Sequence, residues 1–265
     1  MLVSNLETTA QADLELTRED VDRFERDGFL ISRNLAPARL CERMRQVAVD
    51  QLEKQSGTLE YEADLQYPGA PESLDAPGGE TIRRLKQAHA RHISFTEWVC
   101  YLPLVRRLEQ LLGPRIAMPL AHHNCIMTKQ PAFSSDTDWH QDVRYWHFQR
   151  HDLVNAWLAL GDENRRNGAL RLIPGSHRLH FEPRQFDERL FFRHDTAPNQ
   201  ALIQRHVTMT LRPGDVVFFH ARCLHSASRN HTDHTKYSVV FSFRPADNAP
   251  MPGTRSASAA ELRIP

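Results

Sequence analysis

The chain changes its pattern of hydrophobic and polar residues near residue 115. Before that point, apolar residues recur at helical spacing, and residues such as Thr17 and Gly28 mark where a helix begins and ends. This pattern predicts helices over 17–28, over 37–47 and over about 94–112, the last tolerating or kinking at Pro103. A short strand is expected at 28–31.

After residue 115 the apolar residues fall in short runs separated by turn dipeptides such as Pro213-Gly214. These runs predict strands at 122–128, 139–146, 154–160, 169–173, 207–211, 216–220 and 237–243. Many short strands preceded by helices are typical of a sandwich or barrel with helices packed on one face. We therefore expect one domain over residues 1–265, with 1–16 flexible, 17–114 a mainly helical flank and 115–246 the β core.

The amino-acid composition indicates which kinds of binding partner to expect. The chain has 33 basic and 33 acidic residues, and their charges cancel. The net charge therefore gives no indication of binding to nucleic acid or to a membrane surface. It has no apolar run of about eighteen residues and no N-terminal secretion signal. The four cysteines form no CxxC pair, which favours reduced thiols over a disulfide framework or a zinc ribbon. We expect a cytoplasmic protein that binds a small molecule, with no nucleic-acid or membrane partner; its oligomeric state is left open.

The segment Trp139-His140-Gln141-Asp142 carries the first chemical signal. Side chains two apart in a strand point to the same face, so His140 and Asp142 present an imidazole and a carboxylate side by side. Two histidines and one carboxylate on one face of an ion leave positions open, as in non-haem Fe(II) oxygenases. The motif alone is weak, because a surface strand with an ion pair gives the same pattern. A third ligand has to come from a distant strand.

Further segments give this motif its context. They are 24–30 (FERDGFL), 129–133 (KQPAF), 139–142 (WHQD), 167–170 (NGAL), 173–177 (IPGSH) and the Gly214-Asp215 strand followed by His225. In this order and spacing, the chain from about residue 17 to 244 resembles the phytanoyl-CoA dioxygenase family of Fe(II)/2-oxoglutarate oxygenases, which includes ectoine hydroxylases. The resemblance implies a double-stranded β-helix, a cupin-like jelly roll with helices outside, and iron held by His140, Asp142 and His225.

The resemblance also implies contacts to the cosubstrate 2-oxoglutarate. The family usually anchors its distal carboxylate with an arginine about eleven residues after the second histidine, and this chain has Lys236 there. Polar residues alternate with apolar ones from Lys236 onward, which places Lys236 on the interior face of the barrel. A lysine pairs with a carboxylate as a point charge, without the fork of arginine. Asn124 and Thr128, on one face of an earlier strand, are further expected contacts, and the alternative for both is strand capping or cross-strand pairing.

Substrate contacts are expected just after the iron motif. Arg144 and Trp146 follow Asp142 by two and four residues, so a strand that continues carries both toward the cavity. A buried cation there favours a polar or anionic small molecule. If the strand ends after Asp142, Arg144 makes a structural ion pair instead, and Trp146 is a core residue.

Two long aperiodic segments, 57–79 and 181–200, are expected to form a lid over the iron. The basic cluster of Arg83, Arg84 and Lys86 is more typical of a solvated helix face than of a substrate site.

We therefore expect an Fe(II)- and 2-oxoglutarate-dependent dioxygenase that hydroxylates a small-molecule metabolite and releases succinate and CO2. One alternative is a cupin-like metal-dependent enzyme that does not use 2-oxoglutarate. Another is a non-catalytic binding protein on the same fold. Succinate production coupled to oxygen uptake separates the first from the other two.

Overall fold

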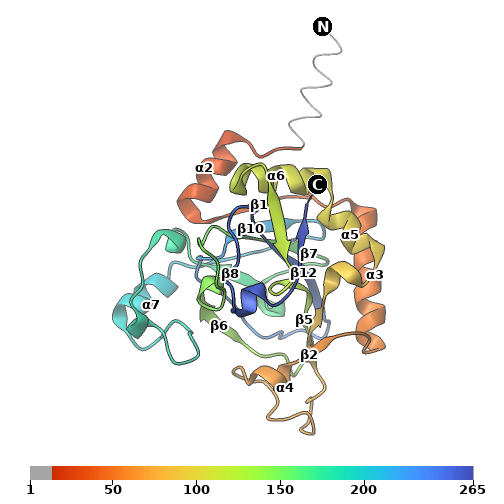
Figure 1. Ribbon diagram of the computed structural model, residues 1–265. Coiled ribbons are helices and arrows are strands. Elements are labelled where there is room, and N and C mark those ends of the chain that lie inside the picture. Colours follow the sequence, from red (N-terminus) through yellow and green to blue (C-terminus); the bar gives the residue numbers. More distant parts are fainter. Residues whose placement is uncertain (1–13, 265) are drawn as a thin grey trace.

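A computed structural model of the chain describes residues 14–264 (Figure 1). Its longer helices are α2 (Arg18–Asp27), α3 (Ala38–Glu53), α4 (Glu62–Leu65), α5 (Ile93–Val99), α6 (Leu102–Leu112) and α7 (Ala197–Ile203). Its strands are β1 (Phe29–Ser32), β2 (Leu59–Tyr61), β3 (Ile82–Lys86), β4 (Ile116–Pro119), β5 (Asn124–Lys129), β6 (Thr137–His140), β7 (Val154–Ala159), β8 (Leu170–Leu172), β9 (Val207–Thr208), β10 (Val216–His220), β11 (His225–Ala227), β12 (Lys236–Pro245) and β13 (Glu261–Arg263).

The strands form two sheets. The larger sheet has the order β1-β10-β7-β12-β5-β3-β2, with β4 paired to β12 and β13 paired to β4, and the smaller has the order β6-β11-β8-β9. The pairs between named strands are antiparallel. Neighbours in these sheets are often far apart in sequence, as expected for a jelly roll. The fold class predicted from the sequence is confirmed.

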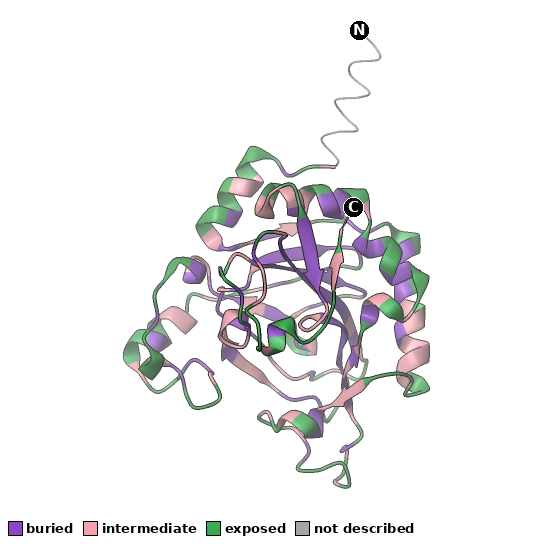
Figure 2. Ribbon diagram, in the orientation of Figure 1, coloured by how far each residue is buried: buried purple, intermediate pink, exposed green. Residues whose placement is uncertain are grey.

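Hydrophobic residues pack on both faces of the larger sheet. Along β12, Val239 and Phe241 face a cluster shared with Leu104 and Leu108 of α6, while Val240 faces a cluster shared with β8 of the smaller sheet. This alternation follows from the two-residue period of a strand. Helices α3, α5 and α6 therefore cover the outer face, and the interior of the barrel lies between the sheets (Figures 1 and 2).

The flank over 17–114 is less helical than predicted. Strand β1 pairs with β10, and β3 pairs with β5, so this region supplies strands to the larger sheet. The predicted helix over 94–112 is two helices, and Pro103 lies in the first turn of α6, where its missing N–H costs no helical hydrogen bond. The basic cluster of Arg83, Arg84 and Lys86 lies on β3 rather than on a helix, and Arg83 is fully buried.

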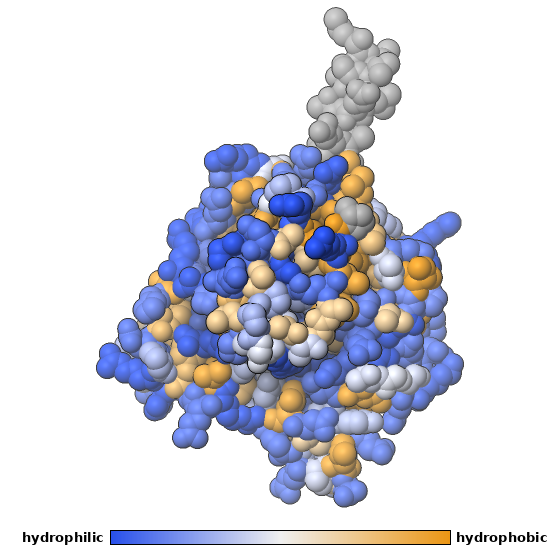
Figure 3. Space-filling model, in the orientation of Figure 1, coloured by the Kyte–Doolittle hydropathy of each residue, from blue (hydrophilic) through white to orange (hydrophobic). Residues whose placement is uncertain are grey.

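Of the segment 1–16 that was predicted to be flexible, residues 1–13 lie outside the described residues. Leu16 is held by α6, because its backbone N–H donates to Oε1 of Gln110 (2.7 Å) and its carbonyl accepts from Nε2 of the same side chain (3.1 Å). None of the described helices is long and apolar enough to span a lipid bilayer. On the face drawn in Figure 3 the surface is mostly hydrophilic, with scattered hydrophobic side chains.

Gly28 gives a test of the packing between α2 and the barrel. It ends α2 with φ of +81°, and an added Cβ would lie 2.4 Å from Nδ1 of His177 and 2.5 Å from Sγ of Cys223. We expect Gly28→Ala to lower the free energy of unfolding by ~1–3 kcal/mol through backbone strain and by a further ~1–3 kcal/mol through overpacking. Urea unfolding measures this loss. Gly253→Ala is the control, because Gly253 also has a positive φ (+76°) but open space around it. Equal losses in both variants would contradict the steric argument.

Candidate metal centre

Three side chains meet where the two sheets approach each other. His140 ends β6 and His225 begins β11, and the two residues face each other in the antiparallel register. Asp142 follows in a 3-10 turn (Asp142–Arg144). Its Oδ1 lies 3.8 Å from Nε2 of each histidine, and one potential ligand atom from each of the three residues lies within 4.8 Å of the others. The predicted triad is thus brought together in space.

The backbone holds both imidazoles in one orientation. Nδ1 of His140 lies 2.8 Å from the carbonyl of Asp138, and Nδ1 of His225 lies 3.0 Å from the carbonyl of Cys223. A carbonyl only accepts, so Nδ1 carries the proton and Nε2 presents its lone pair to the centre of the triad. Burial, with the neighbouring His225, lowers the pKa of His140 to about 3, and burial lowers the pKa of His225. Both rings are therefore neutral, as metal ligation requires.

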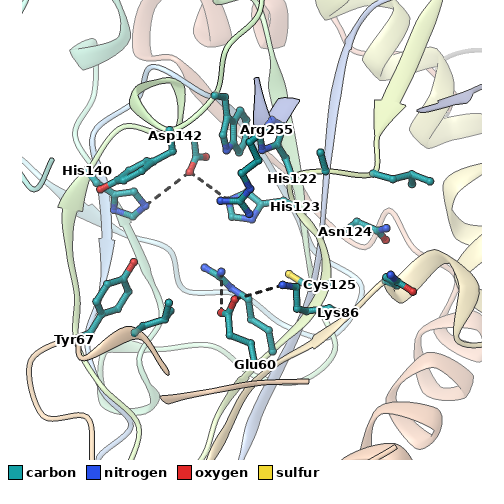
Figure 4. A pocket seen from close by; sticks show the side chains of 17 residues that line it. Glu60, Tyr67, Lys86, His122, His123, Asn124, Cys125, His140, Asp142 and Arg255 are labelled. Carbon is teal, nitrogen blue, oxygen red and sulfur yellow. Dashed lines mark hydrogen bonds and ion pairs between the residues drawn. The ribbon is translucent and has the colours of Figure 1, made fainter. Parts of the chain in front are cut away.

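The carboxylate of Asp142 is oriented from the larger sheet. Nδ2 of Asn155, on β7, donates to Oδ2 (2.7 Å), and Ser242 of β12 donates to the amide oxygen of Asn155 (2.5 Å). Nε2 of His123 lies 3.3 Å from Oδ1 (Figure 4). Burial alone would raise the pKa of Asp142, but the imidazole of His123 holds it well below its ordinary range. Burial opposes protonation of His123, yet Asp142 raises its pKa to about 9.

The donor set suits Fe(II). Two imidazole nitrogens and one carboxylate oxygen form the facial set that non-haem iron oxygenases use, and four thiolates or an all-oxygen cage would suit other metals. The supporting hydrogen bonds to Nδ1 and to the carboxylate are those that fix ligands around a metal.

A cavity of about 370 Å³ borders the triad, and an ion held by His140 and Asp142 would lie at its wall. Glu60 and Lys86 stand across the cavity from Asp142 and His123 (Figure 4). The wall also contains Arg84, Tyr67, His122, Trp146 and Arg255. A cavity of this size lined mainly by polar side chains suits a small polar ligand.

The fold and this geometry agree with comparisons to known proteins. The phytanoyl-CoA dioxygenase (PhyH) family profile matches residues 24–238, which is most of the chain. The chain belongs to the phytanoyl-CoA dioxygenase family. The resemblance and the enzyme class predicted from the sequence are thereby confirmed.

Several known proteins are similar to this chain in sequence or in fold. The human peroxisomal phytanoyl-CoA dioxygenase is 28% identical over 244 residues, which cover 88% of this chain and 69% of that one. An ectoine dioxygenase of Bordetella parapertussis is 24% identical, covering 88% and 77%. Among solved structures, EctD from S. alaskensis with 2-oxoglutarate and 5-hydroxyectoine has a TM-score of 0.74 at 19% identity, covering 89% and 78%. The carbocyclase SnoK has a TM-score of 0.70 at 20% identity, covering 91% and 89%.

Arg144 and Trp146, the two substrate contacts expected after the iron motif, lie in different surroundings. Strand β6 ends at His140, earlier than the predicted strand over 139–146, because the chain turns into the 3-10 helix at Asp142. Arg144 therefore leaves the ligand face, donates to Gln141 (3.1 Å) and lies 3.4 Å above the ring of Phe186. The prediction that a continuing strand carries Arg144 into the cavity is wrong.

Trp146 reaches the cavity by a different route. It stacks on His122 with ring centroids 4.8 Å apart and meets the edge of His123 at 5.3 Å, and it lines the cavity wall.

Asn124 and Thr128 lie on the face of β5 opposite to the one predicted. Ile126, between them, belongs to the helix-side cluster, whereas Met127 belongs to the interior cluster. The side chain of Asn124 bonds to the backbone N–H of His89 (3.1 Å), and the hydroxyl of Thr128 donates to a carbonyl of β3. Thr128 is therefore satisfied by β3, whereas Asn124, although bonded to His89, still lines the cavity, so its contact with the cosubstrate stays a prediction. His123, the residue just before β5, also lines the cavity and contacts Asp142, and no sequence pattern distinguishes it among the fifteen histidines of the chain.

Lys236 does lie on the interior face of β12, but it has a partner there. Nζ of Lys236 is 3.1 Å from Oε2 of Glu163 and 3.1 Å from the hydroxyl of Ser238, and both charged side chains are almost fully buried. Glu163 lies in a loop after β7, and its role was not foreseen from the sequence. An internal carboxylate thus occupies the partner position that the resemblance implies for the cosubstrate.

The two predicted lid segments contact each other beside the metal centre. Arg189, in the second segment, donates to the backbone carbonyls of Leu65 (2.5 Å) and Gln66 (2.9 Å) in the first. Tyr67 and Phe191, one from each segment, have ring centroids 5.2 Å apart, and Phe191 meets the ring of His140 at 6.1 Å. Both segments therefore border the triad.

Removing the support of the carboxylate should weaken metal binding. We expect Asn155→Ala to lower Mn(II) affinity roughly 10–100-fold, as for other groups that orient metal ligands, measured by calorimetric titration. Asn248→Ala is the control, because Asn248 is equally buried but bonds to Arg150 and Asp152. Unchanged affinity in Asn155→Ala would show that Asp142 needs no such support.

Arg189→Ala should loosen the contact between the two segments. We expect faster amide hydrogen exchange in residues 65–70 and 187–193, because the side-chain bonds from Arg189 to Leu65 and Gln66 are lost. Arg193→Ala, which removes only an exposed pair with Asp195, should leave exchange in 65–70 unchanged. Equal exchange in both variants would mean that Arg189 does not join the segments.

Proposed function

We propose that this chain is an Fe(II)- and 2-oxoglutarate-dependent dioxygenase that oxidises a small-molecule metabolite and releases succinate and CO2. The observation that carries the proposal is the triad of His140, Asp142 and His225 at the wall of a polar cavity, in a chain of the phytanoyl-CoA dioxygenase family. Bound together, iron and 2-oxoglutarate would activate dioxygen, the oxidant that attacks a substrate C–H bond.

The side chains of this protein hold and shield that chemistry. His140 and His225 offer fixed Nε2 lone pairs, and Asp142 supplies the negative charge that favours a divalent ion. Tyr67 and Phe191 bring aromatic rings from two segments to the side of His140, where they reduce the access of water.

The substrate class follows from the cavity wall. Trp146 offers a flat apolar surface, and the half-buried Lys86 and the exposed Arg255 add positive charge. Arg144 does not line the cavity and therefore gives no support for a polar or anionic substrate, whereas Lys86 and Arg255 do. We propose that the substrate is a polar or anionic small molecule. The ectoine dioxygenases among the relatives are named for a small polar substrate.

A cytoplasmic location is also proposed. The four cysteines are unpaired and three of them are buried, which suits a reducing compartment.

The function is tested by the ligand variants. We expect Asp142→Ala and His225→Ala to lose more than about a hundredfold in Fe(II) affinity, since even supporting groups are worth roughly 10–100-fold. Both should also fail to form succinate from 2-oxoglutarate. Asp195→Ala, at an exposed carboxylate, is the control. Wild-type iron affinity in either variant would refute the triad, and product formation without succinate would favour the cupin-like alternative.

A further inference from the structure

The ion pair between Lys236 and Glu163 is complete without a ligand. Oε1 of Glu163 accepts from Nε1 of Trp157 (3.0 Å) and from the hydroxyl of Ser238 (2.7 Å), while Oε2 accepts from Lys236. Nζ of Lys236 also lies 5.0 Å above the ring centre of Trp157. The backbone of Glu163 is fixed as well, since it exchanges two hydrogen bonds with Leu211 (2.9 and 3.0 Å). Every group of this cluster therefore already has partners.

A second carboxylate at this place would be unfavourable. Lys236 and Glu163 are exposed by only 2% and 0% of their side chains, so their charges cancel in a medium of low polarity. A cosubstrate carboxylate that approached Lys236 would also approach the carboxylate of Glu163, and like charges in a buried site repel strongly. The position implied by family resemblance therefore does not fit the distal carboxylate of 2-oxoglutarate.

Arg84, unlike Lys236, keeps a donor group that has no acceptor among the described residues. It lies on β3 opposite Met127, a residue of the interior cluster, and it lines the cavity together with His140 and Asp142. Nη1 of Arg84 is 2.9 Å from Oε1 of Glu60, and Nε is 3.4 Å from the sulfur of Met127. Its Nη2 has no acceptor among the described residues, so one edge of the guanidinium can still bind an anion.

The charges around Arg84 also leave room for an anion. Glu60 is shared between Arg84 and Lys86, whose Nζ is 3.9 Å from Oε2 of Glu60. Two cations with one carboxylate give a local charge of +1, whereas Lys236 with Glu163 gives zero. A guanidinium also binds a carboxylate with two parallel hydrogen bonds, which an ammonium cannot do.

We propose that Arg84, and not Lys236, anchors the distal carboxylate of 2-oxoglutarate in this protein. The inference rests on the proposed function, because it assumes that 2-oxoglutarate binds at the triad. It moves the anchor from β12 to β3 and makes the Lys236–Glu163 pair a structural element of the barrel interior.

The test compares two 2-oxoacids on the Mn(II)-loaded, full-length protein without oxygen, by calorimetry. 2-Oxopentanoate matches 2-oxoglutarate in chain length but has a methyl group in place of the distal carboxylate. We expect the wild type to prefer 2-oxoglutarate and Arg84→Gln to bind it roughly 10–100-fold more weakly, with the affinity for 2-oxopentanoate unchanged. An unchanged Mn(II) affinity of Arg84→Gln shows that the variant is folded and its metal centre intact.

Two further variants complete the design. The double variant Glu163→Gln/Lys236→Gln removes both charges at once, which avoids leaving one of them buried and unpaired. It should keep the preference for 2-oxoglutarate. Arg255→Gln removes a cation from the same cavity and should also keep the preference, which excludes a general effect of cavity charge.

The outcomes separate this inference from the proposed function. If the wild type binds neither 2-oxoacid, the proposed function fails and the inference with it. If the wild type prefers 2-oxoglutarate but Arg84→Gln keeps that preference, or the double variant loses it, the inference alone is overturned. Equal loss in Arg84→Gln and Arg255→Gln would also overturn the assignment to Arg84.

Discussion

His140 and His225 face each other across the antiparallel pair of β6 and β11, and the metal centre is built around this register. Because β6 ends at once, Asp142 turns back toward both imidazoles instead of continuing along a strand. Its carboxylate is then fixed by Asn155 from the opposite sheet. The triad therefore ties the two sheets together, and its geometry depends on how closely they approach.

Strand β12 supports two polar networks inside the barrel. Ser242 orients Asn155 and through it the carboxylate of Asp142, whereas Ser238 and Lys236 hold Glu163. These β12 residues share the interior face, since they are separated by even numbers of positions. Buried polar groups of this kind are stable only when every donor and acceptor has a partner. One strand thus serves the metal centre at one place and closes off a potential anion site at another.

Proteins similar to this chain include an ectoine dioxygenase and a carbocyclase, which differ in the reaction that their names give. A shared scaffold does not by itself select a substrate, which is chosen by the side chains that line the cavity. In this chain the distinctive feature is the distribution of charge: a neutral buried pair at Lys236 and an excess of positive charge at Arg84 and Lys86. This distribution of charge is the basis for the proposal that an anion binds on the side of the cavity formed by β3.

Local features of this protein could be predicted from its sequence. The alternation along β12 correctly placed Lys236 inside the barrel, and the order of the motifs led to His140 and His225. Tertiary structure decided which partner each side chain meets. Lys236 and Glu163 are 73 positions apart, so no local pattern links them. Which residues near the start of β5 reach the cavity depended on its packing against β3 and β12, and His123 lines the cavity as well as Asn124. Local periodicity fixes which residues share a face, but only packing against the rest of the chain decides which face is buried inside.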